Sequence, residues 1–389
     1  MIADEFFLLL RMLSEFNTNS FQYIKEWEEI FAHYLGVRYA IAVNSGRTGM
    51  KFILRSLELN RGDEVIIPAY TLVDLVGIIQ SLGLTVVPAD IDSKTFNINP
   101  DSIIKKITAR TKVILATHIF GMPCQIDRIL DIARPRSIFV IEDCAHSIGA
   151  EFKGRKTGSF GDASFFSFET IKPINTYGGG MVTTNDERLA QNVRKAVVHY
   201  EGQAKAPVKK IISAFIENWL LPTPLSFPVL YLLTSPYWNK KMYNFYRQIQ
   251  KLSALKSAFT DLQAFLGIEK LKTLDERIAH RRRLANLFKS LLNSKFVPQQ
   301  LEEGILSNYY FFVALVPSDT KRLRRLLLTH GIDAGIGAEI ADDCGSLLGH
   351  SDCSIAKEVF QRAIQLPLHE GMLEHHILYV AKVLKRQFK

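Results

Sequence analysis

Lys172 follows a stretch of chain whose residue types suit a covalent cofactor site. A serine, Ser167, lies five residues before it, and three glycines follow at 178–180. Upstream, an apolar run at 137–141 (SIFVI) is followed directly by Glu142 and Asp143. A carboxylate at the end of a buried strand, a serine before a lysine and glycines after it suit pyridoxal phosphate (PLP), with Lys172 as its Schiff-base partner.

PLP needs four kinds of group from a protein. Lys172 is the candidate amine, which would also serve as acid and base in a proton shift. Asp143 is the candidate carboxylate that keeps the pyridine nitrogen protonated. The phosphate requires backbone N–H groups at a helix start, and the ring requires a flat or apolar face. The candidates are Gly46, Arg47, Thr48 and Ser167 for the phosphate, and Tyr70, Leu72 or His146 for the ring.

Each of these features alone has a simpler interpretation. A strand-end aspartate is more often a helix cap, and a lysine after a strand is usually a solvated surface residue. Glycines alone indicate only a turn or a close approach of the backbone. All the features occur in order within one predicted α/β domain, each at a strand end. That coincidence favours the cofactor site.

The elements that would position these residues alternate between strand and helix. Apolar residues at helical spacing predict a first helix at 21–35. After it, short apolar runs that predict strands alternate with segments whose apolar residues have helical spacing. This pattern predicts an α/β fold with a mainly parallel sheet and helices on both faces. Ligands of such sheets lie beyond the carboxyl ends of the strands. The predicted strands are 39–43, 64–68, 85–89, 112–117 and 137–141, and the predicted helices between them are 46–57, 72–82, 100–107 and 126–133.

The 389 residues suit one large domain and a smaller one. We expect a large PLP-binding α/β domain at 1–202 and an apolar, proline-rich insertion at 203–256. Residues 257–389 would supply an interface helix and a small C-terminal α+β domain. A strand at 309–316 and a final amphipathic helix at 373–388 belong to that last part.

The bulk composition indicates a globular protein without nucleic-acid signals. The chain has 48 basic and 39 acidic residues, a net charge of +9. The basic residues form no stripe interleaved with aromatics, and the four cysteines lack the spacing of zinc ligands, so we expect neither nucleic acid nor metal as a partner. Few, irregularly spaced cysteines and an acidic N-terminus without a secretory pattern predict a cytoplasmic location.

Residues 211–238 form an unusual apolar segment with one charge and four prolines. The prolines argue against a helix that spans a membrane. Two interpretations remain open. The segment either packs as a lid or a dimer surface, or it lies in a membrane interface with its flanking lysines on anionic lipid. The second would make the protein peripherally membrane-associated.

The chain resembles the DegT/DnrJ/EryC1/StrS family of PLP-dependent sugar aminotransferases, which have the aspartate-aminotransferase fold (fold type I). The resemblance covers about residues 25–200 and 257–385, and its motifs are jointly highly specific. They are 44–50 (NSGRTGM), 62–68 (GDEVIIP), 118–121 (HIFG), 140–146 (VIEDCAH), 158–163 (GSFGDA), 166–168 (FSF) with Lys172, 179–180 (GG), 262–264 (LQA) with Gly267, and 365–369 (QLPLH).

The resemblance implies an activity. Family members transfer an amino group from glutamate to a keto-sugar carried on a nucleotide, through pyridoxamine phosphate, and are usually homodimers with sites built across the interface. By the same likeness Lys172 is the Schiff-base lysine, Asp143 pairs with the pyridine nitrogen and His146 packs near the ring. Arg47, Thr48 and Ser167 would contact the phosphate. Relatives with histidine in place of the lysine are dehydratases, so Lys172 favours transamination.

The chain departs from the family pattern at three places. Arg47 stands where threonine is usual, and Leu72 stands where an aromatic residue is common. The Asn-x-Arg of the neighbouring subunit is absent in register, where Lys256, Ser257 and Ala258 stand instead; Lys256 or Asn244 would have to replace its contact. Two alternatives therefore stay open: another PLP reaction on a sugar, such as dehydration or elimination, or a non-catalytic family member that binds a membrane or a partner.

Overall fold

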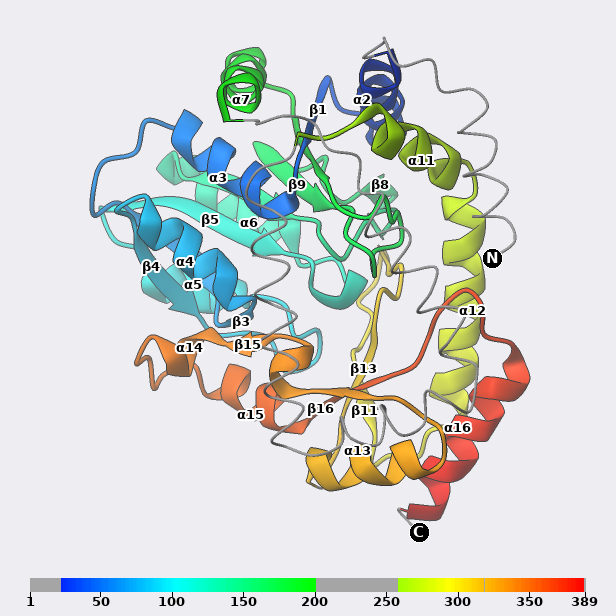
Figure 1. The fold of residues 1–389 in the computed structure, drawn as a ribbon. Coiled ribbons are helices and arrows are strands. Elements are labelled where there is room, and N and C mark those ends of the chain that lie inside the picture. The colour runs from blue at the N-terminus through cyan, green and yellow to red at the C-terminus, as the bar shows by residue number, and fades with distance from the viewer. Residues whose placement is uncertain (1–21, 201–257, 318, 388–389) are drawn as a thin grey trace.

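The computed structural model describes residues 22–200, 258–317 and 319–387 (Figure 1). The predicted insertion at 203–256, including the segment 211–238, lies outside the described residues, as do Lys256 and Asn244. Within the described ranges, no helix is both long and apolar enough to cross a membrane.

A seven-stranded sheet forms the centre of the larger part. Its order is β1-β10-β9-β6-β5-β2-β4, and only β10 runs antiparallel to its neighbours. The predicted mainly parallel sheet is confirmed. β4 contains Pro88 and lies at an edge, where a missing N–H donor is tolerated. The strands are β1 (Tyr39–Val43), β2 (Glu64–Pro68), β4 (Thr85–Ala89), β5 (Thr111–Thr117), β6 (Phe139–Asp143), β9 (Ala163–Ser167) and β10 (Gly180–Thr184).

Helices cover both faces of this sheet, as the alternation of strands and helices predicts. Phe165 packs against residues of α3 on one face of the sheet. Its neighbour Phe166 packs with Trp27 and Phe31 on the opposite face. Successive residues of a strand point to opposite faces of the sheet. Where both faces are buried, neighbouring residues such as these two must therefore both be apolar. The first face carries α3 (Gly46–Ser56), α4 (Val73–Ser81) and α7 (Glu187–Tyr200); the second carries α2 (Gln22–Leu35), α5 (Pro100–Lys106), α6 (Ile126–Ala133) and α11 (Asp261–Lys272).

A long helix, α12 (Leu274–Leu291), leads to the smaller C-terminal part at the bottom of Figure 1. There an antiparallel sheet has the order β11-β13-β16-β14. Phe288 of α12 and Phe312 of β13 stack at 4.9 Å in its core. The predicted α+β character is confirmed. The elements are β11 (Val297–Pro298), α13 (Thr320–Thr329), β13 (Phe312–Leu315), β14 (Gly335–Ile336), α14 (Cys344–Leu347), α15 (Ser354–Arg362), β16 (Ala363–Leu366) and α16 (Glu374–Gln387).

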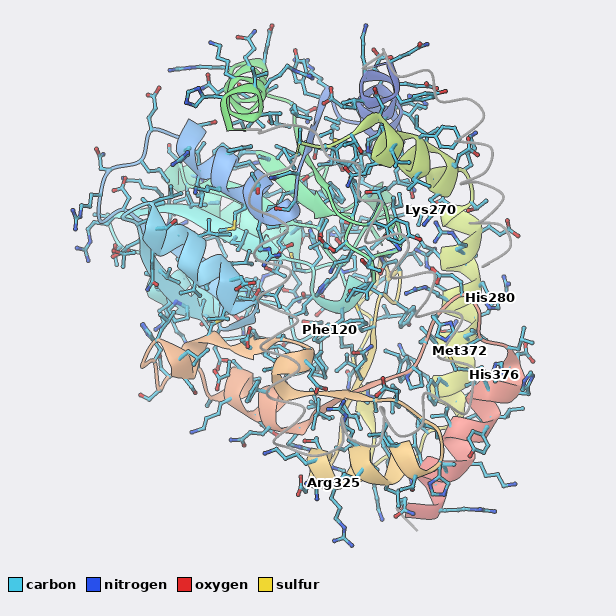
Figure 2. The ribbon with its side chains drawn as sticks, viewed as in Figure 1. Phe120, Lys270, His280, Arg325, Met372 and His376 are labelled. Atoms are coloured by element: carbon cyan, nitrogen blue, oxygen red, sulfur yellow. The ribbon has the colours of Figure 1, made fainter. Side chains whose placement is uncertain are left out.

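Short strands connect the two parts. β15 (Asp342–Asp343) pairs with β3 (Tyr70–Thr71), and β12 (Ile305–Leu306) pairs with β7 (Glu151–Phe152), which pairs with β8 (Arg155–Lys156). Figure 2 places Phe120 where the central-sheet part meets the C-terminal part. Segments of the second part are therefore anchored next to strand ends of the first. The exact domain boundaries stay a prediction.

Candidate active site

A cavity of about 200 Å³ lies beyond the carboxyl ends of β6 and β9. Seven of the nine predicted site residues line it. Thr48 and Tyr70 do not: the Thr48 hydroxyl lies 2.9 Å from that of Ser45, and Tyr70 is fully buried against Phe120. The seven that the structure brings together are Gly46, Arg47, Leu72, Asp143, His146, Ser167 and Lys172.

Lys172 lies in the loop between β9 and β10 and faces this cavity. Burial lowers the pKa of its amine from 10.5 to about 7, although the carboxylates of Asp143 and Glu169 oppose the shift. The glycines downstream close the loop: Gly179 has a φ of +100°, and a side chain there would clash with Phe259. An amine with a pKa of about 7 has a large neutral fraction at pH 7, and the neutral amine is a competent nucleophile.

Asp143 is the last residue of β6, and its carboxylate is buried at the cavity wall. Burial raises the pKa of this carboxyl. The N–H of Ala145, which donates to it at 3.0 Å, and the positive charge of Lys172 lower the pKa, but burial has the larger effect. A buried carboxylate of this kind gains from a cationic partner. A protonated ring nitrogen would be such a partner.

Glu142, the neighbour of Asp143, points to the other face of β6 and is fully buried. Its carboxylate accepts hydrogen bonds from His118 Nε2 at 2.9 Å and from the N–H groups of Gly158, Phe160 and Gly161. Burial alone would raise the pKa of Glu142, but these hydrogen bonds outweigh it and lower the pKa below its usual range. This network fixes the end of β6 and thereby the position of Asp143.

The N-terminus of α3 opens onto the same cavity. Ser45 caps the helix by accepting the N–H of Thr48 at 3.1 Å. Gly46 lets the helix start approach β9, because a Cβ there would lie 2.9 Å from the carbonyl oxygen of Phe166. Helix N-termini attract anions, and Ser167 adds a hydroxyl at the end of β9. This geometry suits a phosphate group.

Arg47 contributes more than its backbone to the site. Its Nη1 lies 2.6 Å from Oδ2 of Asp74 on α4, and both residues line the cavity. Leu72, two residues before Asp74, also lines the wall. Position 47 thus offers the site a guanidinium that a carboxylate orients, in addition to its backbone N–H.

Two flat rings also border the cavity. His146 and Tyr310 stack with centroids 4.5 Å apart, and Lys172 Nζ lies 4.5 Å from the Tyr310 centroid. Burial and the positive charge of Lys172 lower the pKa of His146 well below its usual range, so the ring is neutral. Its Nδ1 accepts the N–H of Phe120 at 3.3 Å.

Sequence reasoning missed the contribution of the C-terminal part. Tyr310 precedes β13, and Glu339, which also lines the cavity, is held by Arg324 of α13. Nothing in the spacing links these residues to Lys172, more than a hundred positions away. The missed lining residues include Asp74, Glu169, Tyr310, Phe311, Ala338, Glu339 and Ile340.

The donor set fits PLP. One cavity brings together a lysine amine with a lowered pKa, a buried strand-end carboxylate, a helix N-terminus with a serine hydroxyl, and two flat rings. Each of these matches one part of that cofactor. The fold and the site together are those expected of a PLP-dependent enzyme.

Comparisons with known proteins identify the family. A family model described as the DegT/DnrJ/EryC1/StrS aminotransferase family matches residues 8–385, and the chain belongs to that family. The predicted resemblance is confirmed.

Two curated relatives and one solved structure illustrate the likeness. The chain is 29% identical over 365 residues to GDP-perosamine synthase of Escherichia coli O157:H7, covering 92% of this chain and 88% of that one. It is 34% identical to GDP-perosamine synthase of Caulobacter vibrioides over 70% of this chain and 62% of the relative. The aminotransferase from Psychrobacter cryohalolentis shares the fold, with a TM-score of 0.77 and 24% identity over 100% of this chain and 96% of the other.

Proposed function

We propose that this protein transfers an amino group from glutamate to a keto-sugar carried on a nucleotide, with PLP held at Lys172. The observation that carries the proposal is the single cavity that Lys172, Asp143 and the N-terminus of α3 share. Its relatives in Escherichia coli and Caulobacter, both named GDP-perosamine synthase, support a nucleotide-linked sugar as the acceptor.

Each residue has a defined task in this proposal. When bound, PLP supplies the carbonyl that takes up the amino group and a ring that accepts an electron pair. Asp143 holds a proton on the ring nitrogen, and Ser167 with the start of α3 binds the phosphate. Lys172 Nζ, whose pKa is lowered to about 7, would take a proton from Cα of the amino donor and return it to the cofactor.

The polar groups of the cavity suit a substrate with hydroxyls. Asp74, Glu169 and Glu339 line it, and carboxylate oxygens accept hydrogen bonds from hydroxyl groups. Glu339 keeps its orientation because Arg324 binds one of its oxygens and the N–H of Ile336 donates to the other at 3.2 Å. The hydroxyl groups of a sugar are hydrogen-bond donors that carboxylate oxygens of this kind accept.

We also propose a homodimer. Ile171, next to Lys172, lines the cavity and is 62% exposed in the single chain. A large apolar side chain at the rim of an active site is more stable when a second surface covers it. Light scattering tests the homodimer separately from the reaction. A monomeric mass in a solution of active enzyme would contradict the homodimer.

The experiment that tests the reaction uses ¹⁵N-labelled glutamate and a panel of keto-sugar nucleotides. Transfer of ¹⁵N to the sugar, with 2-oxoglutarate released in equal amount, supports the proposal. A deoxygenated sugar without nitrogen indicates dehydration instead, and no turnover with any acceptor despite bound PLP contradicts a role in sugar transamination.

A further inference from the structure

Two arginines one turn apart on α12 lie beside the Lys172 loop. Arg277 donates from Nη1 to the carbonyl oxygen of Pro173 at 2.7 Å, and Pro173 directly follows Lys172. Arg277 also donates from Nη2 to the carbonyl oxygen of Lys270 at 2.8 Å. The arginine therefore ties the loop that carries Lys172 to the junction of α11 and α12. Figure 2 shows Lys270 near that junction and His280 further along α12.

Arg281, four residues later, holds the ring beneath Lys172. Its Nη1 donates to the carbonyl oxygens of Tyr309 and Tyr310, at 3.0 and 3.1 Å. Tyr309 has a φ of +48°, an unfavourable conformation for a residue with a side chain. The two hydrogen bonds from Arg281 offset that strain and fix Tyr310, whose ring centroid is 4.5 Å from Lys172 Nζ.

One carboxylate joins the two arginines. Glu370 accepts from Arg281 Nη2 at 3.0 Å and from Arg277 Nη1 at 3.4 Å, one with each oxygen. Burial alone would raise the pKa of Glu370, but both guanidinium groups lower it, so it is ionised at neutral pH. Its loop is held against α12 a second time, because His280 Nε2 donates to the carbonyl oxygen of Met372 at 2.9 Å (Figure 2).

We propose that Arg277, Glu370 and Arg281 form a positioning triad that holds Lys172 above the Tyr310 ring. None of the three lines the cavity, so they act through Pro173 and Tyr310 and not on substrate. Arginine suits this task because its planar fork binds a carboxylate and carbonyl oxygens at once. The triad links the lysine loop of the large part with the C-terminal part, which supplies both Tyr310 and Glu370.

The inference rests on the proposed role of Lys172, but its test uses the full-length protein free of PLP. Lys172 is acylated with a lysine-reactive ester between pH 6 and 10, and its modification is quantified by peptide mass spectrometry. Only the neutral amine reacts, so the profile reports the state and surroundings of that amine. Loss of the sugar reaction would leave this readout unaffected, which keeps the two proposals separable.

The substitution Glu370→Gln keeps the size of the side chain and removes its charge. If the triad positions Lys172, the ammonium moves toward solvent, and the profile shifts to higher pH by about one unit, so that modification at pH 7 falls about fivefold. Removing a negative charge without moving the lysine would shift the profile the other way, to lower pH. The direction of the shift therefore separates positioning from simple electrostatics.

Two further variants complete the test. Arg277→Lys keeps the positive charge but loses the planar guanidinium that binds two partners at once. It should shift the pH profile of Lys172 acylation in the same direction as Glu370→Gln. It replaces Glu370→Gln in the test if that variant does not fold. Arg282→Lys is the matched control, since Arg282 lies on the same helix but donates to the carbonyl oxygens of Ser307 at 2.8 Å and Leu306 at 3.3 Å, and not to those of Pro173, Tyr309 or Tyr310. A folded Glu370→Gln or Arg277→Lys protein with an unshifted or downshifted profile overturns the proposal.

Discussion

Replacing Lys172 with methionine should stabilise the PLP-free protein at neutral pH. Burial lowers the pKa of this amine from 10.5 to about 7, and the nearby Arg47 adds to the effect, while Asp143 and Glu169 oppose it. In the unfolded chain the same amine has its ordinary pKa. Folding therefore places an ammonium group where it is unfavourable, and methionine removes that group with little change of volume.

The pH dependence follows from the direction of this shift. Between pH 7 and 10.5 the unfolded chain binds more protons at Lys172 than the native protein, so stability rises with pH in that window. The unfavourable contribution is complete below pH 7 and vanishes near pH 10.5. The fall in pKa corresponds to about 5 kcal/mol. Because the side chain is partly exposed in its cavity, screening reduces the expected effect to about 2–3 kcal/mol.

The assay is urea unfolding followed by circular dichroism at several pH values. Lys172→Met should exceed the wild type by about 2–3 kcal/mol at pH 6–7, and the difference should shrink toward zero near pH 10. Lys105→Met, on the exposed side of α5, is the control and should show no such trend. A Lys172→Met protein with wild-type stability, or with a gain that does not depend on pH, would refute the reasoning.

Three other substitutions test separate parts of the site. Asp143→Asn should leave PLP bound but lower the rate of amino transfer on the order of 10²-fold, because the ring nitrogen loses its charged partner; an unchanged kcat contradicts this role. Arg47→Met should weaken binding of PLP about tenfold while leaving binding of pyridoxal, which lacks the phosphate, unchanged; equal losses for both, measured by fluorescence titration, would remove Arg47 from the phosphate site. Glu142→Gln should lower the free energy of unfolding by about 3 kcal/mol, because His118 and three buried N–H groups lose a charged acceptor; urea unfolding checks this, and a loss below about 1 kcal/mol speaks against the network.

The central sheet and half of the site are readable from the sequence because their signals are local. Apolar runs such as 137–141, just before Glu142 and Asp143, predict buried strands, and parallel strands place their carboxyl ends at one edge. Asp143, Ser167 and Lys172 converge for that reason. The observed helix and strand ends lie within three residues of the predicted ones for β6 and α16.

The rest of the site depends on packing between distant segments. Tyr310 and Glu339 reach the cavity only because α12 carries the C-terminal part back against the strand ends, and β15 pairs with β3. Tyr70, expected at the ring face, is instead buried beside Phe120, since the aromatic side chain fills the junction between the two parts. No local pattern reports such a contact.

The most direct test of the account asks which lysine holds the cofactor. The full-length protein is loaded with PLP, reduced with borohydride, digested and mapped by mass spectrometry. We expect the added mass of reduced PLP on the peptide that contains Lys172, and neither this mass nor the absorbance band of lysine-bound PLP in Lys172→Ala. Attachment at another lysine, or an unchanged absorbance spectrum in Lys172→Ala, would contradict the account.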